Sequence, residues 1–99
     1  MAIAVEIDCP GVTLEQYDEA LANGGFLFGG VLPLDGIFHW VAETDDGIRV
    51  VNVWASRATF DDFAAKAADA FRRLGVDFTS IKVEFFEVHN ILFGTRRTL

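Results

Sequence analysis

The sequence of 99 residues has a single cysteine, only two prolines and few basic residues. Cys9 therefore cannot form a disulfide within the chain or take part in a cysteine-cluster metal site. The 8 Lys and Arg residues are outnumbered by 15 Asp and Glu, which gives a formal net charge of −7. Because nucleic-acid binding proteins neutralise phosphates with clustered basic residues, we expect neither nucleic acid nor an anionic membrane as a partner.

Long apolar runs and leader-like segments are also missing from the sequence. No stretch approaches the length of a membrane span, and residues 1–8 show no basic region followed by an apolar run. We therefore expect no signal peptide and a location in a reducing cytoplasm. Aromatic residues, by contrast, are plentiful, since the chain has ten Phe and two Trp and is 52 % hydrophobic. This composition predicts one packed domain over residues 1–99.

Alternation of apolar and polar residues predicts four strands. The first covers residues 2–8 and the last covers residues 80–89. Between them, residues 36–54 have the pattern of a hairpin with a two-residue turn at Asp46-Gly47. Such a turn pairs His39 with Trp54 and Val41 with Asn52.

Two amphipathic helices are predicted between these strands. Thr13 and Gln16 have the spacing of a capping box for the first helix, and Ser56 is the expected N-cap of the second, which extends to Leu74. The order β-α-β-β-α-β predicts an α+β, ferredoxin-like fold with a four-stranded antiparallel sheet and two helices on one face. Residues 24–36 combine five glycines with apolar residues, which indicates either a packed connection or a mobile flap over a pocket.

Alternation also divides the sheet into two sets of residues. The set expected to face the helices is Ile3, Val5, Ile7, Phe38, Trp40, Val51, Val53, Ile81, Val83 and Phe85. The set expected on the uncovered face is Ala4, Glu6, Asp8, His39, Val41, Glu43, Val50, Asn52, Trp54, Lys82, Glu84, Phe86 and Val88. This second set would form a large exposed apolar patch. We therefore predict a homodimer that packs sheet against sheet, with the polar residues lining a cavity between the subunits.

The strand-to-helix segment VNVWASRATFDDF, residues 51–63, and the Ala-rich helix after it resemble the dimeric α/β-barrel superfamily. The likeness is greatest to its antibiotic-biosynthesis-monooxygenase-like branch, and in topology it covers nearly the whole chain. The resemblance implies a homodimer of ferredoxin-like subunits, each with a pocket between the sheet and the helices or loops. Members of the superfamily include cofactor-free oxygenases that act on aromatic polyketides, and enzymes that degrade haem.

Haem degradation is not expected for this chain. The haem-degrading members use a His on the helix after the Trp as iron ligand and an Asn in the first strand. Residues 57–74 contain no His, and the first strand has Glu6 and Asp8 instead of Asn. We therefore expect no cofactor. A metal site of His39, His89 and a carboxylate has no support from the spacing of these residues.

His39 is the candidate general base, with a proton affinity that neighbouring carboxylates would adjust. The resemblance implies that Asn52 orients the substrate or stabilises an enolate-like oxygen and that Trp54 stacks on the ligand. The other residues expected at the ligand are Val41, Phe86, Glu43 and Glu84. An alternative is that His39 only forms hydrogen bonds across the dimer interface.

Two functions remain open at this point. One is a small-molecule-binding protein that acts as a cofactor-free, monooxygenase-like enzyme on a hydrophobic or aromatic ligand. The other is a non-catalytic structural or stress-linked binding dimer, in which the same polar residues only set the register of the interface. A ligand-sized void beside His39 and Trp54 favours the enzyme, and a filled, dry interface favours the structural dimer.

Overall fold

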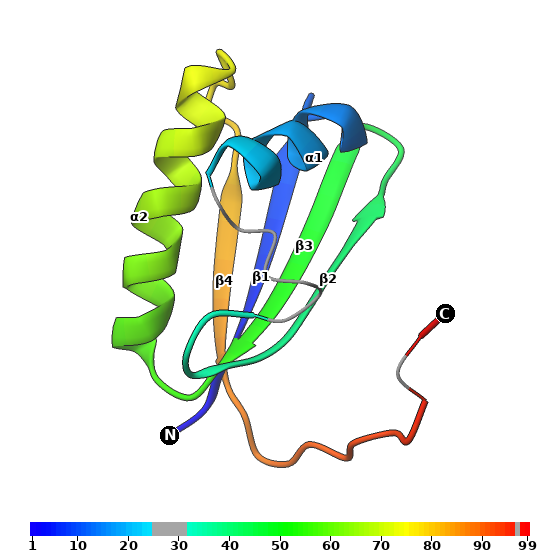
Figure 1. The fold of residues 1–99 in the computed structure, drawn as a ribbon, viewed down its shortest axis with the longest axis vertical. Coiled ribbons are helices and arrows are strands. Elements are labelled where there is room, and N and C mark those ends of the chain that lie inside the picture. Colours follow the sequence, from blue (N-terminus) through cyan, green and yellow to red (C-terminus); the bar gives the residue numbers. More distant parts are fainter. Residues whose placement is uncertain (25–31, 97) are drawn as a thin grey trace.

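The computed structural model describes residues 1–24, 32–96 and 98–99, and it confirms the predicted order of elements. The strands are β1 (Ile3–Pro10), β2 (Gly36–Glu43), β3 (Gly47–Trp54) and β4 (Lys82–Glu87), and the helices are α1 (Leu14–Asn23) and α2 (Arg57–Arg73). The strands pair antiparallel in the order β2-β3-β1-β4. Both helices cover the same face of this sheet (Figure 1). This arrangement is the predicted ferredoxin-like α+β fold.

Side-chain caps begin both helices at the predicted residues. At α1 the hydroxyl of Thr13 accepts from the backbone N–H of Gln16 at 3.1 Å, and the side chain of Gln16 accepts from the N–H of Thr13 at 3.0 Å. At α2 the hydroxyl of Ser56 accepts from the N–H of Thr59 at 3.3 Å. These bonds satisfy N–H groups that have no partner within the helix.

The hairpin between β2 and β3 has a wider turn than predicted. Glu43 pairs with Ile48, and the N–H of Thr44 donates to the carbonyl of Gly47 at 2.9 Å. The observed pairs are His39 with Asn52 and Val41 with Val50, in place of His39 with Trp54 and Val41 with Asn52. Because the pairing between the strands shifts by two residues and not by one, the residues of β2 and β3 that were expected to share a face still share one.

The predicted assignment of the hairpin residues to the faces of the sheet was wrong. Val5 of β1 lies opposite Asn52 of β3, so Asn52 and its neighbour His39 share the face on which Val5 is buried. The strand residues on the helix-covered face are Ile3, Val5, Ile7, Cys9, His39, Val41, Glu43, Ile48, Val50, Asn52, Trp54, Val83, Phe85 and Glu87. Alternation defines two sets within a strand without saying which set is covered, and β3 is apolar in both sets. His39, Asn52 and Trp54, which were expected to line a cavity between two sheets, therefore lie on the covered face instead.

The core lies between the sheet and the two helices, in two clusters. One consists of Cys9, Val12, Tyr17, Ile48 and Val50, and the other of Val5, Trp54 and Phe60. Trp54 is 1 % exposed, and its ring packs against that of Phe63 with 4.9 Å between centroids. Burial of these aromatic and aliphatic side chains is the main force that holds the helices to the sheet.

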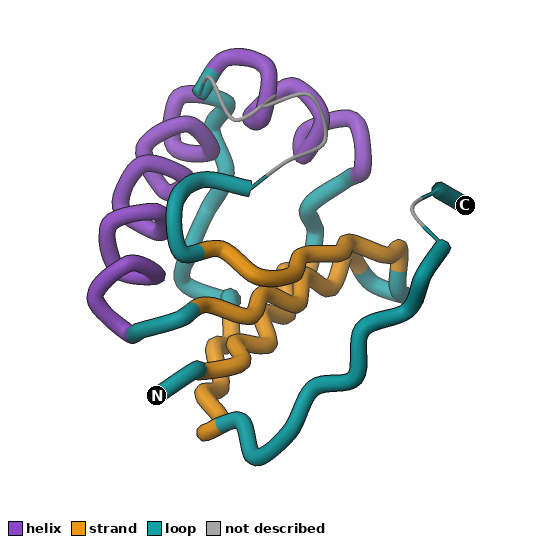
Figure 2. Tube along the Cα trace, turned by 60° about the horizontal axis from the view of Figure 1, so that its bottom comes forward, coloured by secondary structure: helices purple, strands orange, loops and turns teal. Residues whose placement is uncertain are grey.

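The uncovered face of the sheet combines an apolar end with a charged end. Phe38, Trp40 and Phe86 are 49 %, 39 % and 48 % exposed on it. At the charged end, Arg49 forms ion pairs with Asp8 at 2.7 Å and with Glu6 at 3.6 Å. Figure 2 shows the segment after β4 on the side of the sheet opposite the helices.

Two further predictions concern features outside these layers. The proposed flap or packed connection at residues 24–36 falls largely on residues 25–31, which lie outside the described residues. Within the part of the chain that the structure describes, no helix combines the length and apolar character needed to cross a bilayer.

Candidate functional site

A cavity of about 220 Å³ lies between the helix-covered face of the sheet and the two helices. Its wall is made mostly of aliphatic and aromatic side chains from the core. The polar groups in the wall belong to Tyr17, His39 and Asn52, together with the thiol of Cys9. No charged side chain is among the described residues that line it. The cavity therefore suits an apolar, uncharged ligand that carries a small number of polar groups.

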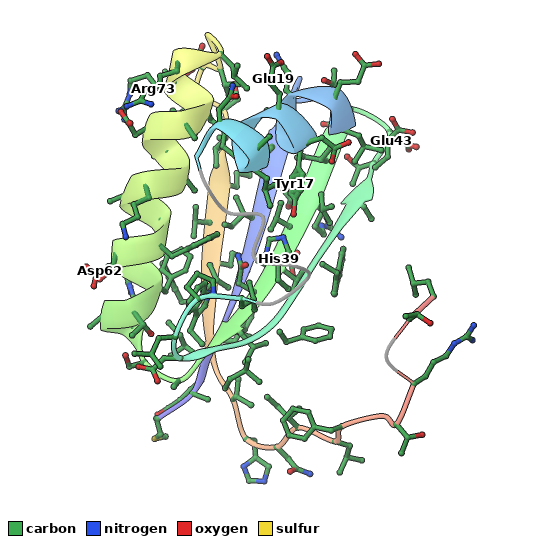
Figure 3. The ribbon with its side chains drawn as sticks, viewed as in Figure 1. Tyr17, Glu19, His39, Glu43, Asp62 and Arg73 are labelled. Carbon is green, nitrogen blue, oxygen red and sulfur yellow. The ribbon has the colours of Figure 1, made fainter. Side chains whose placement is uncertain are left out.

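Three side chains from three elements form a hydrogen-bonded chain at this cavity. The hydroxyl of Tyr17 on α1 contacts Nε2 of His39 on β2, and Nδ1 of His39 lies 2.5 Å from Oδ1 of Asn52 on β3. Figure 3 shows Tyr17 and His39 pointing toward each other between the helix and the sheet. The contact between His39 and Asn52 follows from their pairing across the hairpin, since directly paired residues place their side chains next to each other on one face.

The partners of His39 determine where its proton lies. The amide oxygen of Asn52 can only accept, so Nδ1 of His39 carries the proton and donates it. Nε2 then has a free lone pair and accepts from the hydroxyl of Tyr17. The two hydrogen bonds therefore point in the same direction: the Tyr17 hydroxyl donates to the His39 ring, and the ring donates to the Asn52 oxygen.

Burial keeps the titratable groups at the cavity neutral. It lowers the pKa of His39, although the hydrogen bond to Asn52 acts in the opposite direction. Burial, together with the charge of Asp18, raises the pKa of Tyr17 to about 12. Burial, together with the charge of Asp8, raises the pKa of Cys9 to about 11. At neutral pH the imidazole is thus free to accept a proton, and the thiol is a poor nucleophile because the thiolate is the reactive form.

Two buried donors near the cavity have no protein partner among the described residues. They are Nδ2 of Asn52, a side chain with 0 % exposure that lines the cavity, and Nε1 of Trp54. A buried donor without a partner costs about 1–3 kcal/mol. Nδ2 of Asn52 has no accessible surface, so a ligand oxygen reaches it only if the side chains around it move.

The structure brings together only part of the predicted site. His39 and Asn52 line the cavity, whereas Trp54 lies behind Phe63, which lines it, and Val41 packs against the neighbouring core cluster. Glu43 shares the face of His39 but lies at the far end of β2 and is exposed (Figure 3). Glu84 and Phe86 are on the other face, opposite Glu6 and Ala4 of β1.

Tyr17 also belongs to the site, but its hydroxyl was not identified as a functional group from the sequence. Its spacing of four residues from Leu21 places it on the apolar side of α1, and the residue is only 8 % exposed. The available signal was that a buried Tyr hydroxyl needs a polar partner. Among the described residues, no group of three His, Cys, Asp or Glu side chains is arranged to hold a metal ion.

Comparison with known proteins gives matches in structure only. No protein-family model and no curated protein matches the chain in sequence. SnoaB, a cofactor-independent oxygenase from Streptomyces nogalater, matches with a TM-score of 0.59 at 14 % identity, over 92 % of this chain and 95 % of that one. An antibiotic-biosynthesis-monooxygenase-like protein from Deinococcus radiodurans matches with a TM-score of 0.56 at 14 % identity, over 97 % and 100 % of the two chains.

A third similar structure was solved with a small molecule bound. It is a monooxygenase from the gene ActVA-Orf6 of Streptomyces coelicolor in complex with the ligand Nanaomycin D. It matches with a TM-score of 0.54 at 19 % identity, over 95 % of this chain and 92 % of that one. At these identities the likeness concerns the fold alone, and it agrees with the predicted ferredoxin-like architecture.

Proposed function

We propose that this chain is a cofactor-independent oxygenase that acts on a small, neutral hydroxyaromatic compound. The observation that carries the proposal is the buried chain of Tyr17, His39 and Asn52 at the wall of an otherwise apolar cavity. An apolar wall binds an aromatic ring by burial, and a few polar groups orient it. The likeness in fold to SnoaB, a cofactor-independent oxygenase, supports this class of chemistry.

The volume of the cavity limits the size of the ligand. An apolar cavity of about 150 Å³ holds benzene, whereas sites for drug-sized ligands occupy about 300–1,000 Å³. The observed volume of about 220 Å³ lies between these values. A compound of one or two rings fits this range, so we take a naphthol as the simplest probe.

The proposed reaction begins with loss of the phenolic proton. His39 is the ultimate proton acceptor, because it is neutral and buried and its Nδ1–H is held by Asn52. The resulting electron-rich ring reacts with dioxygen. For 1-naphthol, one dioxygen is consumed: one of its atoms becomes the new carbonyl oxygen of a naphthoquinone, and the other leaves as water.

The test is oxygen consumption by the purified protein with 1-naphthol as substrate, with the quinone measured by chromatography. His39→Gln keeps a polar side chain of similar reach but removes the base, so we expect the rate to fall about 100-fold or more. His89→Gln is the matched control, since His89 is exposed beyond the end of β4 and does not line the cavity. Its rate should equal that of the wild type.

Three outcomes would contradict this function. They are an unchanged rate for His39→Gln, an equal loss for both histidine variants, and loss of oxygen consumption on addition of a metal chelator. Binding of 1-naphthol without any oxygen consumption would instead favour the non-catalytic binding protein.

We further propose that the protein is a homodimer joined through the uncovered face of the sheet. The exposed aromatic side chains of Phe38, Trp40 and Phe86 support this, because monomeric proteins rarely leave such patches in water. A two-fold contact needs only one self-complementary surface. In this arrangement each subunit keeps its own cavity on the side away from the interface.

A further inference from the structure

We infer that Tyr17 is the residue through which the ligand of the cavity exchanges its proton with His39. The inference rests on the proposed function and adds a ligand requirement to it. The ligand must present an acidic O–H to the Tyr17 oxygen. Tyr17 belongs to α1, whereas the two residues it acts with belong to the β2–β3 hairpin.

Access to His39 is the first argument. Both ring nitrogens of His39 already have partners, Tyr17 at Nε2 and Asn52 at Nδ1. A ligand in the cavity therefore meets no free nitrogen of the imidazole. A proton can reach Nε2 without breaking this arrangement only through the hydroxyl that is bonded to it.

The hydrogen-bonding capacity left over at the site is the second argument. The hydroxyl of Tyr17 donates its only proton to His39, so its oxygen lone pairs remain for a donor on the ligand. The amide of Asn52 accepts from Nδ1 of His39 and is fully buried, so it holds the imidazole and does not contact the ligand. The site thus offers the ligand one acceptor, the Tyr17 oxygen, which complements a phenolic O–H.

The proton transfer balances without any further reactant. The ligand O–H bond breaks as an O–H bond forms at Tyr17, while the original O–H bond of Tyr17 breaks as an N–H bond forms at Nε2. The products are a ligand anion, a neutral Tyr17 and an imidazolium whose Nδ1–H still donates to Asn52. A free tyrosinate never forms, which matters because burial strongly disfavours one at this position.

The position of Tyr17 is well determined by its own helix. The backbone N–H of Tyr17 donates to the carbonyl of the N-cap Thr13 at 3.0 Å, directly after the capping box. The rings of Tyr17 and His39 are 5.9 Å apart between centroids and inclined by 35°. A side chain in the first turn of a capped helix has little freedom to leave the cavity wall.

The test combines a change in the protein with a matched change in the probe. Tyr17→Phe keeps the ring and removes the hydroxyl, and the probes are 6-hydroxy-1-tetralone and its 6-methoxy analogue, which lacks the O–H donor. Calorimetric dissociation constants are measured for all four combinations. We expect Tyr17→Phe to weaken binding of the hydroxy compound about five- to tenfold, as loss of one hydrogen bond requires, and to leave the methoxy compound within twofold.

A second measurement reports on the histidine itself. Nitrogen NMR of wild-type His39 should show the Nδ1–H tautomer. Tyr17→Phe should raise the pKa of His39, because the hydroxyl bond to Nε2 favours the neutral ring. A purely structural role for Tyr17 would leave the pKa of His39 unchanged.

A third variant covers the case in which Tyr17→Phe does not fold. Tyr17 is the only tyrosine of the chain, so biosynthetic incorporation of fluorotyrosine changes this residue alone. Its fluorine resonance should shift on addition of the hydroxy probe and shift clearly less with the methoxy probe.

The inference is overturned if the wild type does not bind the hydroxy probe, if Tyr17→Phe affects both probes equally, or if the fluorine signal does not distinguish them. These results are independent of oxygen consumption. Failure of the oxygenase proposal with selective binding intact would leave a binding site with the same ligand requirement.

Discussion

At the scale of residues, the polar side chains of Tyr17, His39 and Asn52 depend on one another for their hydrogen bonds. His39 donates to Asn52 and accepts from Tyr17, so removing either partner leaves a buried polar atom of the imidazole without one. Such a loss costs more than the net contribution of the hydrogen bond itself, about 1–3 kcal/mol. The same arrangement keeps His39 uncharged in the folded protein, which links its protonation to folding.

This linkage predicts how stability depends on pH. Because the pKa of His39 is lowered on folding, the unfolded chain binds a proton more readily as the pH falls below the ordinary value of 6.5. The contribution of His39 to the free energy of unfolding is therefore fully present above that pH. It is lost as the pH falls toward the pKa of His39 in the folded protein. Between the two pKa values the free energy of unfolding should fall by up to about 1.4 kcal/mol per pH unit.

Urea denaturation at a series of pH values measures this dependence. His39→Gln should lose the part of the slope that belongs to His39, and His89→Gln should retain the wild-type slope. Identical slopes in the two variants would show that His39 is not the group responsible.

At the scale of elements, α1 determines whether the site is complete. The hairpin supplies His39 and Asn52 together, because they are paired across β2 and β3. Tyr17 arrives separately, on a ten-residue helix that makes its side-chain capping bonds at its first turn. Isolated helices of this length are marginal, so the cap and the packing against the sheet hold Tyr17 in place.

The N-cap of α1 should therefore affect both stability and binding. Thr13→Ala removes the hydroxyl that accepts from Gln16 and should cost about 1 kcal/mol in the free energy of unfolding. It should also weaken binding of 6-hydroxy-1-tetralone, because the first turn carries Tyr17. Ser56→Ala is the matched control, since it removes the corresponding cap of α2 at a similar cost. Equal effects of both variants on binding would contradict a role for the α1 cap at the site.

Much of this architecture could be predicted from local sequence signals. The caps at Thr13 and Ser56 and the alternation of the strands depend on residues close in sequence, so they were found. The covered face of β3 depends on its pairing with β1, about 45 residues away, and the alternation of Val50 to Trp54 fits both choices. His39 and Asn52 were identified as site residues, but the face they share and their partner Tyr17 required the tertiary structure.

At the scale of the whole molecule, the cavity and the exposed aromatic side chains lie on opposite faces of the sheet. The cavity is on the helix-covered side of the sheet, and the exposed aromatic side chains are on the other. The sheet between them is a single layer of backbone with most of its hydrogen bonds made internally. A partner bound at the uncovered face would therefore not obstruct the cavity.

The proposed dimer can be tested through Trp40. Trp40→Glu places a charge among the exposed aromatic side chains of the uncovered face, on the edge strand β2, and should raise the dissociation constant of the dimer about thirtyfold or more, as for loss of an aromatic anchor. Sedimentation velocity measures this shift, and probe binding by the monomer should persist. Leu14→Glu is the matched control, since Leu14 is an exposed apolar residue on α1, and its dimer should remain intact. A wild type that sediments as a monomer at all concentrations would refute the dimer.

The alternation of β2 has a consequence for how this protein can change over generations. His39 points toward the cavity, and its neighbours Phe38 and Trp40 point toward the opposite surface. If the proposed dimer and the proposed reaction hold, substitutions at odd-numbered positions of this strand alter the cavity, and those at even-numbered positions alter the interface. A duplicated copy of such a gene could then form mixed pairs while its cavity stays the same, or acquire a new ligand while its pairing stays the same.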